Sequence, residues 1–472
     1  MTVGGPPPIT GVTGGVAGTS ATYAAVGALA HRYADAGDLL RGWAADDARV
    51  LLDPDLLESA PLSPMTFAEA EASVVAAGAG VHGAAELSLA YEADAVLVRA
   101  TVAAFQECDR LVASSFDALD YTLGRELGCA VPALLLLGAA AAPAWQRLPA
   151  DTRRRLGDEV EEWADEHPAV VQHGVESTGG LLDGLSADAS FLPGLLGLRP
   201  FHPTAADAAS DLAGLYPPEG PAVVHRRPDL DVPLAGTPPA DLAGLMHHLE
   251  QTSALSPPDR PGDQGTIEVQ TLRAPDGTTR HIVYLPGTDD LATSPWHTEG
   301  DARDLPADLR VISGADTTYA DGIRQAMADA GIGRHEPVLL VGHSLGGMEA
   351  ASLLAHGSGF DVTHVVTAGS PIAGIHDYPL GSHVLSLENR GDVVPLLDGH
   401  DNADSVAQTT VQFDDHETSI AANHDLRHYV HGAVAVDASA DPSVRDALAG
   451  LRTDGFLGSG DPATSQVLQV TR

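Results

Sequence analysis

The sequence predicts an α/β domain with a mostly parallel sheet and helices on both faces, preceded by an all-α helical domain. In the N-terminal half, apolar residues recur at alternating steps of three and four, which is typical of helices packed on one face. Further along, short runs rich in valine, isoleucine and leucine alternate with helical patterns, which is typical of parallel strands joined by helices. The predicted division is a helical domain over 1–200, a proline-rich connecting region with one short helix over 201–258, and the α/β domain over 259–472.

The chain is strongly acidic, and this charge excludes some classes of binding partner. Its 472 residues include 65 acidic and 25 basic residues, which give a formal net charge of −40, and every basic residue is an arginine. Such a surface repels nucleic-acid phosphates and anionic lipid headgroups. We therefore expect no nucleic-acid partner.

Neither a transmembrane helix nor a Sec-type signal is predicted. The longest apolar run, 129–145, is short for a bilayer span and contains Pro132 and Pro143, so a buried helix is the better interpretation. Residues 1–15 are rich in glycine and proline and carry no charge, unlike a signal peptide. This leaves the localisation open, as cytoplasmic or exported by a signal-peptide-independent route.

Two long apolar stripes define the helical half. The first comprises Val26, Leu29, Tyr33, Ala36, Leu40 and Trp43, and the second Val98, Val102, Phe105, Cys108, Val112, Phe116, Leu119 and Leu123. The proline-containing segment 53–64 separates them, so the two helices could pack as an antiparallel hairpin. A further helix is predicted from Asp151 to about Glu166. Cys108 and Cys129 both lie in predicted helix and could pair only across a chain reversal, so their disulfide state stays open.

This helical half resembles in outline the long helical hairpins of the WXG100 and related families, which accompany type VII secretion. In this chain Trp43 is followed by Ala44-Ala45 in place of the family's glycine turn. The resemblance implies an interaction or export module that binds a protein partner. A plain helical domain packed against an enzyme accounts for the same stripes.

In the C-terminal half, strands are predicted over 266–272, 281–285, 338–341, 362–367 and 384–387. A sharp turn follows the third of them, with the sequence Gly342-His343-Ser344-Leu345-Gly346 leading into a predicted helix. The pattern G-x-S-x-G between a strand and a helix is typical of a nucleophile elbow, which lifts the serine hydroxyl out of the backbone. Ser344 is therefore the candidate nucleophile.

A nucleophilic serine needs a base and an acid that orients the base, in the chain order serine, acid, histidine. Asp392 follows the strand 384–387, so it is predicted at the carboxyl edge of a parallel sheet, where active-site loops gather. Asp398 in the same loop is a rival acid, and Glu388 is a weaker one.

The candidate base is His424, because it lies beyond the acid in the required order. His428 and His431 are close neighbours in the sequence. The side chain of His343, directly before the nucleophile, is expected to point away from Ser344 Oγ.

The oxyanion of an acyl-transfer reaction needs hydrogen-bond donors. The backbone N–H of Leu345, at the start of the elbow helix, is the first candidate. The second is Thr288, through its N–H or its hydroxyl, because Pro286-Gly287-Thr288 follows an earlier strand and glycine permits a close backbone approach.

From about Ile267 to Val430 the chain resembles the class 3 lipase group of α/β-hydrolases. The ordered elements that carry this resemblance are Pro286-Gly287-Thr288, Trp296, the run Gly342 to Gly347, Gly369-Ser370-Pro371, Asp392-Val393-Val394-Pro395, and His424-Asp425-Leu426 with Tyr429 and His431. The resemblance implies Ser344 as nucleophile, Asp392 as orienting acid, His424 as base, Thr288 as oxyanion donor and a lid around Trp296. This chain has proline before Gly287 where the family usually has arginine.

The expected function is therefore a serine carboxylester hydrolase that acts on lipid or other acyl esters, with no metal or organic cofactor. Peptidases, thioesterases and acyltransferases use the same triad, and a non-catalytic interaction or export protein on a hydrolase scaffold is the alternative from another class. Asp398, His400, Asp401 and Asp404 form an acidic loop, but their spacing fits no standard calcium loop, so a solvated loop is expected.

Overall fold

The computed structural model describes residues 5–147, 152, 155, 168–188, 201–257, 259–291, 293, 300–417 and 419–472. Contacts divide the chain into two units, one formed by Thr19–Ser115 and the other by Met1–Gly18 together with Phe116–Arg472. This division differs from the predicted boundaries near residues 200 and 258. The reason is that segments on both sides of the hairpin belong to the sheet-containing unit, as described below.

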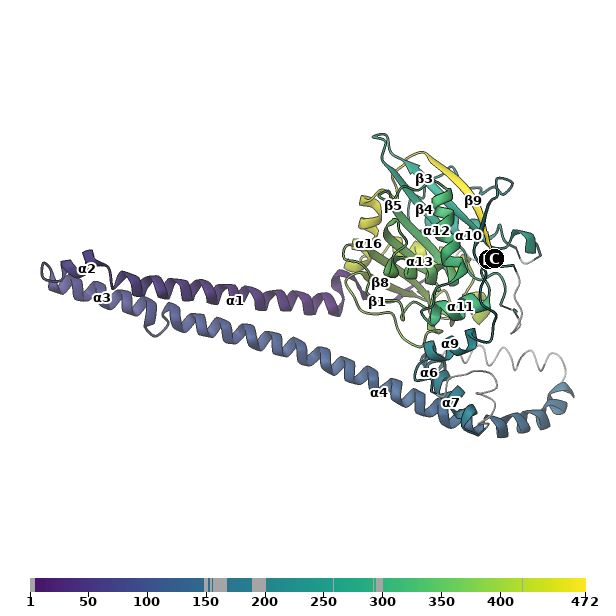
Figure 1. Cartoon of the computed structure of the whole chain (residues 1–472), viewed down its shortest axis with the longest axis horizontal. Coiled ribbons are helices and arrows are strands. Elements are labelled where there is room, and N and C mark those ends of the chain that lie inside the picture. The colour runs from purple at the N-terminus through teal and green to yellow at the C-terminus, as the bar shows by residue number, and fades with distance from the viewer. Residues whose placement is uncertain are drawn as a thin grey trace. The chain divides into compact units, whose positions relative to one another are not determined.

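Helices alone make up the unit Thr19–Ser115 (Figure 1). They are α1 (Thr19–Val50), α2 (Pro54–Ser59), α3 (Pro64–Ala79) and the first part of α4 (Ala84–Arg147). The break between α1 and α2 lies where it was predicted, because the carboxylate of Asp53 accepts a hydrogen bond from the backbone N–H of Asp55 and Pro54 occupies the first turn.

Within this unit α1 and α4 run antiparallel. The hydroxyl of Tyr23 donates to Asp109 over 3.1 Å, and that of Ser88 donates to the carbonyl of Gly37 over 2.8 Å. Cys108 is a free, exposed cysteine. The predicted hairpin is therefore present.

The seam between these helices differs from the predicted one. Small residues are buried there, among them Gly37 and Ser88, whereas Trp43 and Phe105 of the predicted stripes are 59% and 57% exposed. A glycine opposite a serine lets two backbones approach closely, which bulky side chains at the contact would prevent. Periodicity located the helices correctly, and the stripe residue Tyr33 packs against Tyr91 of α4 with ring centroids 5.8 Å apart, but Trp43 and Phe105 lie off the seam.

The second unit contains a nine-stranded mixed sheet with the order β1-β8-β7-β6-β5-β4-β3-β9-β2. Its strands are β1 (Ile9–Gly14), β2 (Val223–Arg226), β3 (Thr266–Arg273), β4 (Thr279–Leu285), β5 (Pro337–His343), β6 (Asp361–Ala368), β7 (His383–Asn389), β8 (Gln408–Phe413) and β9 (Ala463–Thr471). Strands β4 to β8 are parallel to one another, and the outer pairs are antiparallel. The five predicted strands coincide with β3 to β7.

Helices cover both faces of this sheet. The helices that share a core with the strands are α10 (Leu242–Ser253), α11 (Leu305–Ile312), α12 (Thr318–Asp329), α13 (Leu345–His356), α15 (Leu426–Asp437) and α16 (Pro442–Thr453). The same unit also contains α6 (Pro168–Glu176), α7 (Thr178–Asp188), α9 (Ala205–Ala213) and α14 (Ile420–Asn423), with short 3-10 turns at Gly15–Ala17, Pro261–Asp263 and Val394–Leu396.

Strand β5 contributes side chains to the cores on both faces of the sheet. Val338 and Leu340 belong to a core shared with α11, α12 and α13, whereas Leu339 and Val341 belong to a core shared with α10, α15 and α16. Successive side chains of a strand point to opposite faces, so a continuous apolar run is what a strand covered on both sides requires.

The predicted connecting region 201–258 is part of the sheet-containing unit. Its β2 pairs with β9, with Val224 opposite Val470, and its helix α10 buries Leu245 and Met246 in the core beneath the sheet. The proline-rich stretches are the turns between these elements. Near the start of the chain, β1 pairs with β8 at the sheet edge, with Val12 opposite Val411.

Charged and polar side chains connect α4, α7 and α9. The hydroxyl of Tyr121 lies 2.8 Å from Asp183, and the ring of His202 lies 2.6 Å from Asp183 through Nδ1 and 2.7 Å from Asp211 through Nε2. Burial lowers the pKa of His202, but the two carboxylates outweigh it and raise that pKa overall. His202 between two carboxylates therefore links α7 to α9, and Tyr121 links α4 to the same Asp183.

Within the described ranges, no helix combines the length and the apolar character that crossing a membrane requires.

Candidate active site

The turn between β5 and α13 holds Ser344 in a strained backbone conformation. Its φ of 52° and ψ of −124° lie outside the regions that non-glycine residues normally adopt. The backbone N–H of Ser344 donates to Ala368 on the neighbouring strand over 3.0 Å, which anchors the turn. The backbone geometry is that of the predicted nucleophile elbow.

Glycines on either side of Ser344 allow this turn. A Cβ atom on Gly342 would lie 2.3 Å from the carbonyl carbon of Gly346, and a Cβ on Gly346 would lie 2.0 Å from the carbonyl oxygen of Leu285. Both obstacles are backbone atoms, which cannot swing aside as a flexible side chain can. The pattern G-x-S-x-G thus follows from close backbone packing at this turn.

We therefore expect Gly346→Ala to lower the free energy of unfolding by about 2 kcal/mol or more, since overpacking costs at least this much when backbone must move. Gly174→Ala, in helix α6, is the control, because a Cβ there would meet nothing within 4 Å. Denaturant unfolding of both variants measures the difference. Equal stability of the two would show that the elbow tolerates the methyl group.

The predicted acid and base are brought together by the fold. Asp392, which is 2% exposed, lies just after β7, and its Oδ2 is 2.6 Å from His424 Nδ1. The hydroxyl of Tyr429 donates to the same carboxylate oxygen over 2.5 Å, and the backbone N–H of Val394 donates to Oδ1 over 2.9 Å. Three donors thus hold one buried carboxylate in place. The bond to Nδ1 leaves Nε2 of His424 to accept a proton.

The rival acids point elsewhere. Oδ2 of Asp398 accepts from the backbone N–H of Ala373 over 2.6 Å, and Glu388 is hydrogen-bonded to Asn402 and Gln412. Burial raises the pKa of Asp398 to about 6 and that of Glu388 to about 7. Geometry therefore separates Asp392 from its rivals, which sequence position alone did not do.

The other two histidines of the motif share a different carboxylate. His428 and His431 bind the two oxygens of Asp415 through their Nδ1 atoms, over 2.5 and 2.6 Å. They are thus placed apart from Asp392.

His343 contacts the candidate base, a role that the sequence interpretation did not assign to it. Its Nε2–H donates to the backbone carbonyl of His424 over 2.9 Å, and the two rings lie 4.4 Å apart. Burial, with a smaller contribution from the neighbouring His424, lowers the pKa of His343 well below its usual range, so the ring is neutral. The only sequence signal for this role was the position of His343 directly before the nucleophile.

The candidate oxyanion donors flank Ser344. Gly287 approaches so closely that a Cβ there would lie 2.9 Å from Ser344 Cβ. No hydrogen bond to the backbone N–H of Thr288 or of Leu345 is found within the described residues. Both N–H groups are therefore available to a developing oxyanion.

The hydroxyl of Thr288 is committed to another group. It donates to the two carboxylate oxygens of Asp308 over 3.0 and 2.9 Å, and burial raises the pKa of Asp308 to about 7. The sequence analysis expected Thr288 to offer its N–H or its hydroxyl. Among the described residues only the N–H of Thr288 has no hydrogen-bond partner, so the expectation for the hydroxyl is corrected.

A cavity of about 910 Å³ opens over Ser344 and His424, and both residues line it. Its wall is mostly apolar and includes Val175, Ala205, Ala208, Ala209, Leu212, Leu305, Leu309, Ile312, Met348 and Leu397. Among the described residues Ser344 and His424 make no hydrogen bond with each other, which is common in unliganded active sites. Trp296 and most of the predicted lid around it lie outside the described residues.

The elbow helix α13 also buries a carboxyl group, Glu349, which is 1% exposed and hydrogen-bonded to Thr317. Burial raises the pKa of Glu349 to about 8, from an ordinary value of 4.5. The group is thus protonated in the folded chain at neutral pH and ionised in the unfolded chain.

We expect this difference to make stability fall as pH rises. Below the unfolded pKa of 4.5 both states are protonated, and from there to about 8 the unfolded chain gains by releasing a proton. The contribution is roughly 1.4 kcal/mol per pH unit inside this window. Glu349→Gln should flatten the dependence, measured as the free energy of unfolding against pH, whereas Glu69→Gln on the exposed face of α3 should not. Parallel curves for wild type and Glu349→Gln would contradict this prediction.

Comparison with known proteins gives no assignment: no family model matches the chain, and neither curated sequences nor solved structures give a significant match.

Proposed function

We propose that this protein is a serine carboxylester hydrolase of the α/β-hydrolase type. The observation that carries the proposal is the hydrogen bond between His424 and the buried Asp392, with Ser344 on a strained elbow that lines the same cavity. An oriented histidine beside a serine that lines the same cavity is the arrangement that acyl transfer to serine needs.

In the proposed reaction, Ser344 Oγ attacks the acyl carbonyl while His424 Nε2 takes the hydroxyl proton. Asp392 holds the imidazole in the required tautomer and stabilises the imidazolium that forms. The backbone N–H groups of Thr288 and Leu345 stabilise the oxyanion. His424 then protonates the leaving alcohol, and water activated by the same histidine hydrolyses the acyl-enzyme.

The cavity supports an apolar acyl substrate. Alanines of α9 and leucines of α11 form much of its wall, so burial of an alkyl chain there is favourable by about 0.8 kcal/mol per methylene group. Esters with medium or long acyl chains should therefore be turned over with a higher kcat/KM than acetates. Assays with p-nitrophenyl esters of increasing chain length measure this preference.

Labelling of the intact protein with a fluorophosphonate tests the proposal. We expect a single adduct on the peptide that contains Ser344, lost in Ser344→Ala and His424→Ala and kept in Ser253→Ala, which removes another serine from the same cavity wall. A well-folded wild type that takes up no adduct would favour the alternative, a non-catalytic interaction module. Transfer of the acyl group to an added alcohol or thiol, in place of hydrolysis, would identify an acyltransferase.

A further inference from the structure

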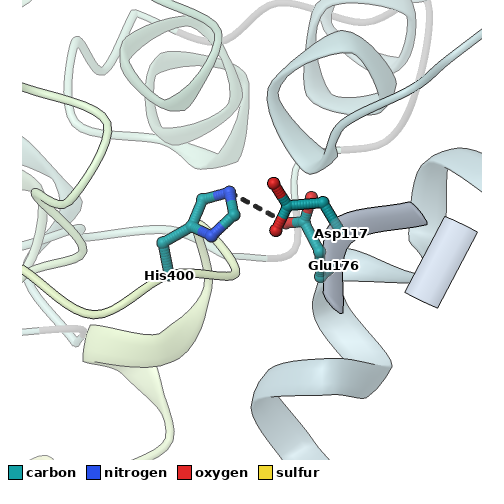
Figure 2. Close-up of side chains that lie close together, drawn as sticks. All are labelled: Asp117, Glu176 and His400. Atoms are coloured by element: carbon teal, nitrogen blue, oxygen red, sulfur yellow. Dashed lines mark ion pairs between the residues drawn. The ribbon is translucent and has the colours of Figure 1, made fainter. Parts of the chain in front are cut away.

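Outside the catalytic cavity, three potential metal ligands converge. Asp117 lies on α4, Glu176 at the end of α6 and His400 in the loop after Val394–Leu396, and one ligand atom from each lies within 4.8 Å of the others. Figure 2 shows the three side chains pointing toward one another from these separate segments. His400 Nε2 is 3.5 Å from Glu176 Oε2.

Glu176 is the unusual member of this group. Its side chain is 3% exposed, and neither carboxylate oxygen has a hydrogen-bond partner among the described residues. An ionised carboxylate in such a position is costly unless a cation or several donors compensate it. The distant ion pair with His400 is too long to be a hydrogen bond.

The surroundings add negative charge. Asp117, Asp120 and Asp398 all lie near Glu176, and His400 is the basic group that opposes their charge. Asp120 is already bonded to His173, over 2.6 Å. The carboxylates around Glu176 therefore outnumber the basic side chains beside them.

A glycine in the loop after Val394–Leu396 allows the close approach of Glu176. Gly399 has a φ of +88°, and a Cβ there would lie 2.1 Å from Glu176 Oε2. Only glycine permits both this backbone conformation and this approach. It brings the neighbouring His400 against the buried carboxylate.

We propose that Asp117, Glu176 and His400 bind a divalent metal ion of the zinc type. Two carboxylates and one imidazole form a donor set that zinc accepts, whereas calcium prefers six or more oxygen ligands. Donor atoms around tetrahedral zinc lie about 3.3 Å apart, so the side chains need only a small inward movement. Water completes the coordination. This proposal departs from the sequence-based expectation of no metal and of a solvated loop over Asp398 to Asp404, because the site needs three separate segments of the chain.

The bound ion would stabilise one wall of the cavity that Ser344 and His424 line. Val175 and Thr178 flank Glu176 in the chain and line the cavity, and Leu397 lines it three residues before His400. Binding would tie the helices α4 and α6 to the loop that follows Asp392. This role is structural, and it holds whether or not Ser344 is an active nucleophile.

Calorimetric titration of the chelator-treated full chain with Zn²⁺, and Co²⁺ absorption spectra, test the site. We expect wild type to bind one ion here and to gain several degrees in Tm on binding. Glu176→Gln and His400→Ala should each weaken this binding by about tenfold or more. Asp401→Asn is the matched control, because it removes one negative charge from the same loop at an exposed position outside the cluster.

Glu176→Gln also serves as a control for variants that fail to fold. It replaces a buried charge with an amide of the same shape, so without metal the variant should be at least as stable as wild type. Equal Zn²⁺ affinity in wild type, Glu176→Gln and His400→Ala would place the binding among the other histidines and overturn the proposal. Failure of wild type to bind Zn²⁺ would do the same, and tighter binding of Ca²⁺ than Zn²⁺ would overturn the assigned class of ion.

Discussion

Ser344→Ala should lower the kcat for ester hydrolysis by roughly 10⁴-fold or more, because the proposed acyl-enzyme cannot form without the hydroxyl. The variant should fold normally, since alanine removes one atom from a side chain whose backbone strain is unchanged. Steady-state assays with a p-nitrophenyl ester that wild type turns over measure the effect, and thermal unfolding shows whether the fold is retained.

Ser253→Ala is the matched control for this experiment. Ser253 lines the same cavity at the end of α10, in a regular helix and not on a strained turn. We expect it to change kcat no more than a few-fold. Turnover that survives in Ser344→Ala but fails in Ser253→Ala would move the nucleophile to the other wall of the cavity.

Asp392→Asn should lower kcat by about 10⁴-fold while the protein remains folded. An amide at this position can donate to Nδ1 of His424, which would leave the proton on Nε2 and prevent that nitrogen from accepting one from Ser344. The imidazolium would also lose its counter-charge. The rate of fluorophosphonate labelling should fall in parallel with kcat, because both depend on the same base.

Asp398→Asn distinguishes the two acids of this loop. Its remaining carbonyl oxygen can still accept the hydrogen bonds from the backbone of Ala373 and Gly374, so the loop should keep its shape. We expect turnover within a few-fold of wild type. A large loss in Asp398→Asn, with little effect of Asp392→Asn, would contradict the placement of the orienting acid.

Local sequence patterns were sufficient where a single element carries its own signal. The apolar run before Ser344 forms β5, and Gly342 is required by its contact with Gly346 within the turn itself, whereas Gly346 packs against Leu285 of β4. The central strands β3 to β7 were also predicted, because each contains valine, isoleucine or leucine in a short run.

Outer strands were missed for a physical reason. Strand β1 mixes two apolar residues with threonine and glycine, and β9 begins with the polar run Thr464-Ser465-Gln466, so both patterns also fit loops. Their pairing with β8 and β3 depends on partners far away in the sequence. The limits of the helical unit could not be predicted for the same reason, since segments before and after it join one sheet.

By itself the sequence determined the α/β class, the elbow at Ser344 and the chain order of acid and base, because these depend on residues that are neighbours along the chain. Only the tertiary structure decided that Asp392 rather than Asp398 meets His424, that His343 and Tyr429 hold this pair, and that α9 and α10 line the cavity. The same is true of the cluster of Asp117, Glu176 and His400. Contacts between residues far apart in sequence leave no periodic signal, since each arises from the packing of whole elements against one another.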